Sequence, residues 1–393
     1  MSRINDLIKE LCPNGVSKYE IKDICKVTRG RVISKMELTE NAGDYPVYSS
    51  QTLNNGVFGK INTYDFEGEY VQWTTDGANA GSIFYRNGKF SVTNVCGLLK
   101  IKDEYLGKIK TNYLAYALTM ESKKYVNYAT SNPKLMSNVM ERITVLIPPL
   151  EVQEEIVRIL DKFGELEAEL EAELEARQSQ YEFWRGKLLD GRKELYVNLG
   201  SLCKIITKGT TPKKYVDTGI NFIKTEAFVG DYVDKTKLSF VDEETHNGFL
   251  KRSILEENDI LFTIAVATIG KMTVVTNDLL PANTNQALAI IRLNNDVNLN
   301  YIKHILKSNY MKEYIKLCVK GSAQPNLNLQ QLNNFEFPFP SAEEQERIVQ
   351  ILDQFDKLVN DISVGLPAEI EARRKQYEYY RNKLLSFEEV SCE

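Results

Sequence analysis

A long amphipathic helix that occurs twice is the feature that most constrains this chain. The first copy is expected over residues 151–189, where apolar and aromatic residues recur at steps of three and four. The spacing continues far beyond the length of an ordinary globular helix, so it indicates a seam that packs against another helix. The second copy is expected over residues 341–385. Two such helices in one chain predict an internal coiled coil.

The two copies match in two registers. Residues 153–163 recur at 345–355 with a shift of 192, and residues 176–189 recur at 372–385 with a shift of 196. The second copy therefore has four extra residues, about one helical turn, near Ser363 to Pro367. Glycine and proline within this insertion predict a kink or a short break. The sequence Ser341-Ala-Glu-Glu344 predicts a capping box at the helix start.

The blocks that precede the helices also repeat. Residues 19–30 return as residues 196–209, and residues 132–135 are answered by residues 324–327 at the shift of 192. Each block shows short strand-like runs separated by turns, followed by one helical stretch. A period this long indicates two copies of a whole domain with its helix. The expected fold class is α+β, with two globular α/β domains separated by two long coiled-coil helices in a pseudo-twofold repeat.

The predicted domain boundaries follow the repeat, and charge is distributed unevenly among the parts. The blocks are residues 1–150 and 191–340, and the helical parts are residues 151–190 and 341–393. The blocks carry net charges of +4 and +3, whereas residues 151–189 carry −6. Acidic helices are a poor surface for DNA phosphates but suit protein partners. The slight basic excess of the blocks is compatible with nucleic acid without demonstrating it.

Cysteine and histidine usage argues against a metal site. The six cysteines form no Cys-x-x-Cys pair, and the two histidines are His246 and His304. No signal peptide or membrane span is visible, so reduced thiols in a cytoplasmic protein are expected. No self-contained enzyme is indicated either. Gly56 to Lys60 is too short for a phosphate-binding loop, and Pro148-Pro149 lacks the neighbours of an adenine methyltransferase loop.

The repeated segments resemble the specificity subunit of type I restriction-modification enzymes. The resemblance is carried by Ile147-Pro-Pro-Leu-Glu-Val-Gln-Glu-Glu-Ile-Val-Arg-Ile-Leu-Asp161 and by Pro338-Phe-Pro-Ser-Ala-Glu-Glu-Gln-Glu-Arg-Ile-Val-Gln-Ile-Leu-Asp353. Two Arg-x-x-Gln-Tyr-Glu phrases, beginning at Arg177 and Arg373, add to it. The matched segments cover nearly the whole chain and occur twice at the same spacing.

This resemblance implies a non-catalytic subunit that gives DNA specificity. Each block would be a target-recognition domain for one half of a bipartite double-stranded DNA target. The two long helices would pack antiparallel as a coiled coil and set the spacing between the halves. Two modification subunits would dock on the helices and carry S-adenosylmethionine. Restriction subunits, which use ATP and Mg, would join them. No cofactor or metal is expected in this chain.

Residue type and loop position indicate which side chains are candidate DNA contacts. Arg and Lys suit guanine edges or phosphates, Asn and Gln suit adenine edges, and Ser and Thr can hold phosphates. In the first block the candidates are Arg29, Arg31, Tyr48, Ser49, Gln51, Asn54, Trp73, Thr74, Asn79, Asn132 and Lys134. In the second block they are Lys208, Thr210, Thr211, Lys213, Lys224, Thr225, Asn283, Asn285, Gln286, Gln324 and Asn326. The stretch from Asn283 to Gln286 fits turn chemistry equally well.

A further set of residues is expected on the helix seams, where they pack between helices or dock a partner. They are Ile156, Leu160, Phe163, Tyr181, Trp184, Ile348, Leu352, Phe355, Tyr377 and Tyr380. An alternative function, a coiled-coil scaffold without a DNA role, fits the helices as well. The unlike polar loops on repeated frames favour DNA recognition, and a gel-shift assay with the partner methyltransferase would separate the two.

Overall fold

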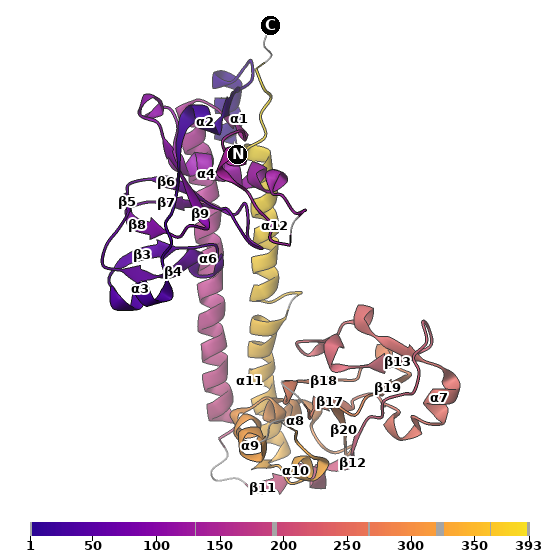
Figure 1. The fold of residues 1–393 in the computed structure, drawn as a ribbon. Coiled ribbons are helices and arrows are strands. Elements are labelled where there is room, and N and C mark those ends of the chain that lie inside the picture. The colour runs from indigo at the N-terminus through magenta and orange to yellow at the C-terminus, as the bar shows by residue number, and fades with distance from the viewer. Residues whose placement is uncertain are drawn as a thin grey trace. The chain divides into compact units, whose positions relative to one another are not determined.

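A computed structural model describes residues 2–129, 131–190, 195–265, 268–319, 326–361 and 363–390. The chain divides into two compact units, Met1–Glu169 with Glu371–Glu393, and Leu170–Ile370. Both are mixed α/β units, as the repeat predicts. The long helix α6 (Leu150–Leu188) is one uninterrupted element that contributes residues to both units (Figure 1).

The first unit contains two four-stranded sheets, ordered β2-β9-β6-β7 and β4-β3-β8-β5, and a pair β1-β10. Its elements before α6 are α1 (Ser2–Leu11), β1 (Ser17–Glu20), α2 (Ile21–Ile24), β2 (Cys25–Arg29), α3 (Lys35–Glu40), β3 (Tyr45–Tyr48), β4 (Val57–Ile61), β5 (Phe66–Glu67), β6 (Tyr70–Thr74), β7 (Ile83–Arg86), β8 (Lys89–Val92), β9 (Cys96–Ile101), α4 (Thr111–Glu121), α5 (Ser137–Met140) and β10 (Thr144–Ile147).

The second unit repeats this plan. Its sheet β12-β20-β17-β18 corresponds to β2-β9-β6-β7, and its pair β11-β21 corresponds to β1-β10. Its elements are β11 (Tyr196–Asn198), β12 (Cys203–Lys208), β13 (Ile220–Ile223), β14 (Phe228–Val229), β15 (Tyr232–Val233), β16 (Ser239–Val241), α7 (Glu243–Asn247), β17 (Ile260–Thr263), β18 (Met272–Val274), β19 (Ala282–Thr284), β20 (Leu288–Leu293), α8 (Leu299–Leu306), α9 (Asn309–Val319), α10 (Leu329–Asn333), β21 (Glu336–Pro338) and α11 (Ala342–Asn360).

The strand registers show that the repeat is structural. Cys25 faces Ile101 and Arg29 faces Gly97, just as Cys203 faces Leu293 and Lys208 faces Ala289. The second copy has one more residue between these points, and a β-bulge between Cys203 and Ile205 absorbs it. Each unit also contains one parallel strand pair, β3 with β8 and β13 with β19.

The central strands are covered on both faces, which explains their apolar composition. In the first unit Val71, Trp73 and Leu99 join a core with α4 and the long helices, whereas Tyr70 and Leu98 pack against β8. In the second unit Phe262 and Ile291 point to the helical core, and Leu261, Leu288 and Ile290 form a separate core with β13 and β19. Successive side chains of one strand point to opposite faces of the sheet and therefore enter two different hydrophobic cores.

The predicted interruption of the second long helix is present. Helix α11 ends at Asn360, and α12 (Leu366–Leu384) begins after the break (Figure 1). A Cβ on Gly365 would lie 2.6 Å from the carbonyl oxygen of Lys357, so glycine permits the close turn. The capping box at Ser341 is only half formed: its hydroxyl accepts from the N–H of Glu344 at 3.4 Å, but the Glu344 carboxylate pairs with Arg347.

Candidate nucleic-acid interface

Five segments of the first unit meet at the ends of its strands. We call residues 29–31, 49–56, 75–79, 93–95 and 127–134, residue 130 excepted, the first loop cluster. Gly77 donates its N–H to the carbonyl of Pro133 at 3.0 Å, and the Asn79 amide donates to the carbonyl of Ser50 at 3.0 Å. Arg29 contacts the connection between β8 and β9, because its guanidinium donates to the carbonyl of Asn94 at 2.6 Å. Segments far apart in sequence therefore form one surface.

Positive charge is only partly compensated in this cluster. Arg29 donates to the Thr75 hydroxyl at 2.9 Å and lies 3.5 Å from Asp76, while Lys134 lies 3.7 Å from the same carboxylate. Two cations thus share one anion at the loop ends. Arg31 differs, because it pairs with Asp65 at 3.1 Å and with Glu37 at 2.6 Å. The pKa of Arg31 is raised above its ordinary value, mainly because its guanidinium donates a hydrogen bond to Glu37.

The connection between β3 and β4 contributes several predicted contacts. Ser49 accepts from the Thr93 hydroxyl at 2.9 Å, and the Gln51 amide donates to the carbonyl of Val57. Asn54 is exposed, and its neighbour Leu53 is 83% exposed. The connection is therefore fastened at its base and open at its tip, as a contact loop requires. Asn132 is also exposed in this cluster.

Burial removes three predicted contacts from the interface. Trp73 and Thr74 are fully buried in β6, where the Trp73 indole N–H donates to the carbonyl of Leu135 at 3.0 Å. Asn283 is fully buried in β19, and its amide joins His246 at 2.6 Å and the carbonyl of Leu250 at 3.2 Å. These side chains serve the core because both faces of their strands are covered. We therefore leave them out of the interface.

The second unit has a corresponding second loop cluster, residues 208–212, 264–265, 283–287 and 326–327. The N–H of Thr210 donates to the carbonyl of Thr284 at 3.0 Å, and the Thr211 hydroxyl donates to Gln286 at 2.9 Å. Asn326 bridges Ala265, and the Asn285 side chain accepts from the N–H of Ala287. The cluster is held by the same kind of backbone bonds as the first.

The remaining candidates of the second block lie beside this cluster or outside the described residues. Lys224 follows β13, and its ammonium lies 5.1 Å from the ring centre of Tyr215. The ammonium of Lys213 lies 5.8 Å from the ring centre of Phe249. Thr225 begins a short turn after Lys224. Gln324 lies outside the described residues.

Paired glycines fix the start of both clusters. A Cβ on Gly30 would lie 2.2 Å from the carbonyl oxygen of Val92, and a Cβ on Gly209 would lie 2.2 Å from that of Asn285. Only glycine permits these approaches. Arg29 and Lys208, which precede the glycines, therefore enter equivalent positions. The frame also equates Lys134 with Asn326, so the two clusters share backbone geometry and differ in side chains.

Within each unit, α6 packs against the second long helical stretch. In the first unit Phe163 stacks on Tyr380 at 5.6 Å and meets Tyr377 at 6.2 Å, and Glu167 pairs with Arg374 at 2.6 Å. This order of contacts is antiparallel. The first-unit seam residues Ile156 and Leu160 are fully buried.

The second unit has its own seam. Tyr181 stacks on Phe355 at 6.1 Å and donates to Asp356 at 3.1 Å, and Ile348 and Leu352 are buried. Trp184 is half-buried, and its ring contacts Phe183 and Lys187 on its own helix.

Equivalent polar contacts dock the block helices on the long helices. In the first unit the Tyr116 hydroxyl donates to Asp161 at 2.6 Å, and in the second unit His304 bonds Asp353 at 2.7 Å. The pKa of Asp353 is lowered from its ordinary value, mainly because the carboxylate is hydrogen-bonded to His304. The same place in the frame thus carries a tyrosine in one unit and a histidine in the other.

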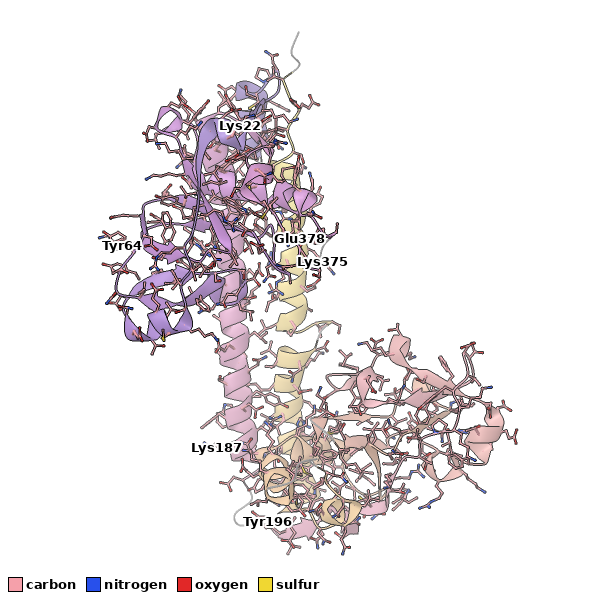
Figure 2. All side chains as sticks on the ribbon, in the orientation of Figure 1. Lys22, Tyr64, Lys187, Tyr196, Lys375 and Glu378 are labelled. Atoms are coloured by element: carbon pink, nitrogen blue, oxygen red, sulfur yellow. The ribbon has the colours of Figure 1, made fainter. Side chains whose placement is uncertain are left out.

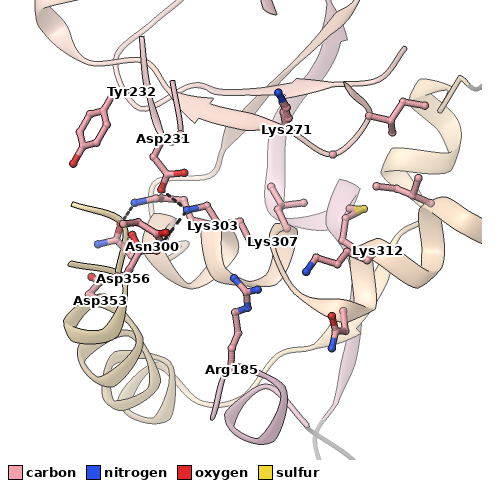
Figure 3. A pocket seen from close by; sticks show the side chains of 18 of the residues that line it. Arg185, Asp231, Tyr232, Lys271, Asn300, Lys303, Lys307, Lys312, Asp353 and Asp356 are labelled. Carbon is pink, nitrogen blue, oxygen red and sulfur yellow. Dashed lines mark hydrogen bonds and ion pairs between the residues drawn. The ribbon is translucent and has the colours of Figure 1, made fainter. Parts of the chain in front are cut away.

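A cleft of about 1030 Å³ lies in the second unit, between the β14–β15 turn, α8, α9 and the long helices (Figure 3). Three of its lysines pair with carboxylates: Lys307 with Asp231, Lys312 with Glu182 at 3.8 Å, and Lys316 with Glu313 at 2.6 Å. Phosphate groups would have to displace these carboxylates. We therefore keep the cleft apart from the candidate DNA interface.

Among the described residues, no group of three or more His, Cys, Asp or Glu side chains is placed to hold a metal ion. No described helix is both long and apolar enough to cross a membrane.

Sequence reasoning missed a group of residues beneath the first loop cluster. Arg86 is 2% exposed and donates to Gln72 at 2.7 Å and to both the side chain and the carbonyl of Asn55, at 3.0 and 2.9 Å. Burial lowers the pKa of Arg86 to about 10. The Asn54-Asn55-Gly56 sequence signals a left-handed turn, but nothing in the sequence pairs it with an arginine thirty residues later.

Comparison with known proteins identifies the frame that carries these clusters. The family model for the type I restriction modification DNA specificity domain matches residues 13–176 and 194–372. The chain belongs to the type I restriction-modification specificity subunit family. The two matches cover both repeats, and the resemblance found in the sequence is confirmed. The scaffold alternative without a DNA role is thereby set aside.

Individual relatives agree with this family. A putative type I specificity subunit of Mycoplasma pneumoniae is 36% identical over 378 residues, 95% of this chain and 98% of the relative. The MpnII type I restriction enzyme specificity subunit of the same organism is 47% identical over 148 residues, 38% of this chain and 44% of that protein. A type I restriction-modification S subunit from M. genitalium shares the fold at 16% identity, with a TM-score of 0.58 over 94% of this chain and 96% of that chain.

Membership of the specificity subunit family fixes the general role. The chain is the non-catalytic DNA specificity component of a type I restriction-modification complex. In this family the cofactors reside in the modification and restriction subunits, and DNA and those subunits are the partners.

Proposed function

We propose that residues 1–150 and 191–340 are the two target-recognition domains, and that each reads one half of a bipartite DNA target through its loop cluster. The observation that carries this assignment is the pairing of equivalent frames with unlike side chains. Arg29 and Lys134 of the first cluster correspond to Lys208 and Asn326 of the second. Two such surfaces would bind backbone similarly and select different bases.

The proposed contacts are the candidates whose side chains are exposed or half-buried in the clusters. Lysine and arginine suit phosphates and guanine, and amides suit adenine. In the first cluster they are Arg29, Ser49, Gln51, Asn54, Asn79, Asn132 and Lys134, with Arg31 and Tyr48 beside them. In the second they are Lys208, Thr210, Thr211, Asn285, Gln286 and Asn326, with Lys213, Lys224 and Thr225 beside them.

The helical parts, residues 151–190 and 341–393, are proposed to set the spacing of the half-targets and to dock two modification subunits, which restriction subunits then join. The acidic charge of α6 disfavours DNA phosphates. Charged side chains such as Lys375 and Glu378 are exposed on α12, where a protein partner could pair with them (Figure 2). S-adenosylmethionine would be carried by the modification subunits, and ATP and Mg by the restriction subunits.

A block exchange tests the assignment. Residues 21–145 are replaced by the corresponding block of a relative, and the complex with its modification subunits is expressed in cells without other DNA methylation. Long-read sequencing then gives the methylated sequence. One half of the target should change while the other half stays the same. The reciprocal exchange of residues 199–337 is the matched control and should change the other half.

The exchange has a clear negative result. If both halves changed together in either chimera, the two blocks would not act as separate recognition domains. If neither half changed, base recognition would lie outside the exchanged blocks.

A further inference from the structure

Arg86 is a buried cation without a carboxylate partner among the described residues. It stands at the end of β7 opposite Tyr70, and its guanidinium lies 3.7 Å from the ring centre of Tyr48 and 4.6 Å from that of Phe84. Its hydrogen bonds go to neutral groups on Gln72 and Asn55. A charge buried without a counter-ion costs free energy even when it is hydrogen-bonded, so its presence points to a role that needs the geometry of the guanidinium.

The group that Arg86 holds is a strained turn. Asn54, Asn55 and Gly56 have φ angles of 50°, 49° and 77°, so three consecutive residues adopt the left-handed conformation. Asparagine tolerates this conformation but does not prefer it. Arg86 donates to the side-chain oxygen and to the backbone carbonyl of Asn55, and a Cβ on Gly56 would lie 3.0 Å from the Nη2 atom of Arg86. The turn and the guanidinium therefore fit one another closely.

The shared frame does not require an arginine at this place. In the second unit Asp259 corresponds to Tyr70 and Val275 to Arg86, and Val275 is fully buried. An apolar side chain thus fills the equivalent position of the same sheet. Arg86 is therefore not required by the shared sheet. It accompanies the loop over residues 49–56, which is particular to the first unit.

We propose that Arg86 is a positioning residue for DNA recognition, which locks residues 49–56 in the conformation that presents Asn54 at the loop tip to the bases. The inference rests on the proposed role of the first loop cluster. Arg86 itself is too buried to contact DNA. It acts through Asn55, while the Gln72 amide, which also faces the carbonyl of Ser49 at 3.5 Å, supports the other end of the same loop.

The test compares Arg86→Met and Arg86→Lys in the complete complex with its modification subunits. Methionine keeps much of the volume and removes the charge, whereas lysine keeps the charge and loses the forked donation to Asn55. Long-read methylation sequencing measures the ratio of cognate to non-cognate bases at every target position. Both variants should lower that ratio by about tenfold at one or two positions of the first-block half, since a well-placed base contact gives discrimination of this order. The other half should be unchanged.

Two controls separate positioning from a merely structural role. Arg292→Met in the second unit removes a part-buried arginine that pairs with Asp259 at 2.8 Å and with Glu256 instead of holding a loop. It should lower thermal stability without altering base preference in either half. Asn55→Gly keeps the left-handed turn and removes one acceptor of Arg86, so it should broaden the same positions to a smaller extent even if the Arg86 variants fold poorly.

The proposal is overturned if the Arg86 and Asn55 variants methylate less DNA but keep the base preferences of the parent chain. It is also overturned if only Arg86→Met broadens the target, because charge and not loop geometry would then be responsible. The half that belongs to the first block is defined independently by the block exchange of the parent chain. Failure of that exchange would count against the proposed function itself.

Discussion

An exchange of two facing core residues would test whether the two units are built on one frame. Trp73 of β6 faces Gly97 of β9, and a Cβ on Gly97 would lie 2.1 Å from the indole ring. At the equivalent place in the second unit, Phe262 faces Ala289. The first unit thus places a large ring opposite a glycine, whereas the second unit places a smaller ring opposite an alanine. We predict that Trp73→Phe and Gly97→Ala compensate one another.

The magnitudes follow from the packing of the first unit. Gly97→Ala alone should cost about 1–3 kcal/mol, because a fully buried ring must shift. Trp73→Phe alone should cost roughly 2–4 kcal/mol, because it leaves a void and removes the N–H that donates to Leu135. Independent effects would sum to roughly 3–7 kcal/mol, whereas the coupled pair should recover about 1–3 kcal/mol of that sum.

Urea unfolding followed by circular dichroism gives the four free energies of the double-mutant cycle. Hydrogen exchange of β9 confirms that the loss is local to the first unit. Ala289→Gly in the second unit is the control and should cost only about 0.5–1 kcal/mol, since nothing is overpacked there. The reasoning is refuted if the double variant loses the full sum, or if Gly97→Ala alone leaves stability unchanged.

Three further outcomes are expected. The hydrogen bond with His304 lowers the pKa of Asp353, so the ionised carboxylate should stabilise the fold above about pH 4 and lose this effect as the pH falls through its lowered pKa. Asp353→Asn should therefore make the free energy of unfolding, measured in urea, fall less steeply with pH on the acid side. A slope equal to that of the parent would contradict this. Leu352→Ala should cost about 2–5 kcal/mol in the same assay, whereas the partly exposed Leu358→Ala should cost under about 1 kcal/mol; equal losses would show that the seam is not tightly packed. Inserting Leu-Glu-Ala-Glu after Ala168 adds ~6 Å of helix and should widen the gap between unchanged half-targets by about one base pair, two at most; methylation mapping that shows an unchanged gap with full activity would mean that the helices do not set it.

Periodic signals in the sequence were sufficient for the helices. The prediction over residues 151–189 differs from Leu150–Leu188 by one residue at each end, and the insertion at Ser363 to Pro367 gives the observed break. These features depend on local spacing and on backbone restrictions of glycine and proline, which a single sequence displays.

Burial and long-range pairing were not predictable in the same way. Trp73 and Asn283 have the residue types of base contacts, yet they lie in strands whose two faces are both covered. Which strands are central depends on contacts between distant segments, such as β6 with β9. Arg86 was missed for the same reason, because its partners are brought to it only by the folded sheet.

The bulge between Cys203 and Ile205 has a consequence for building chimeras. It absorbs one added residue at the start of the strand, so that Lys208 still faces Ala289 as Arg29 faces Gly97. A junction placed before Cys25 or Cys203 carries the strand and its local irregularity together into the new context. A junction placed between the bulge and Lys208, and aligned by counting from the cysteine, would leave the strand one residue out of register and turn the following side chains to the opposite face. The safe crossover points for exchanging target halves therefore lie upstream of the two cysteines.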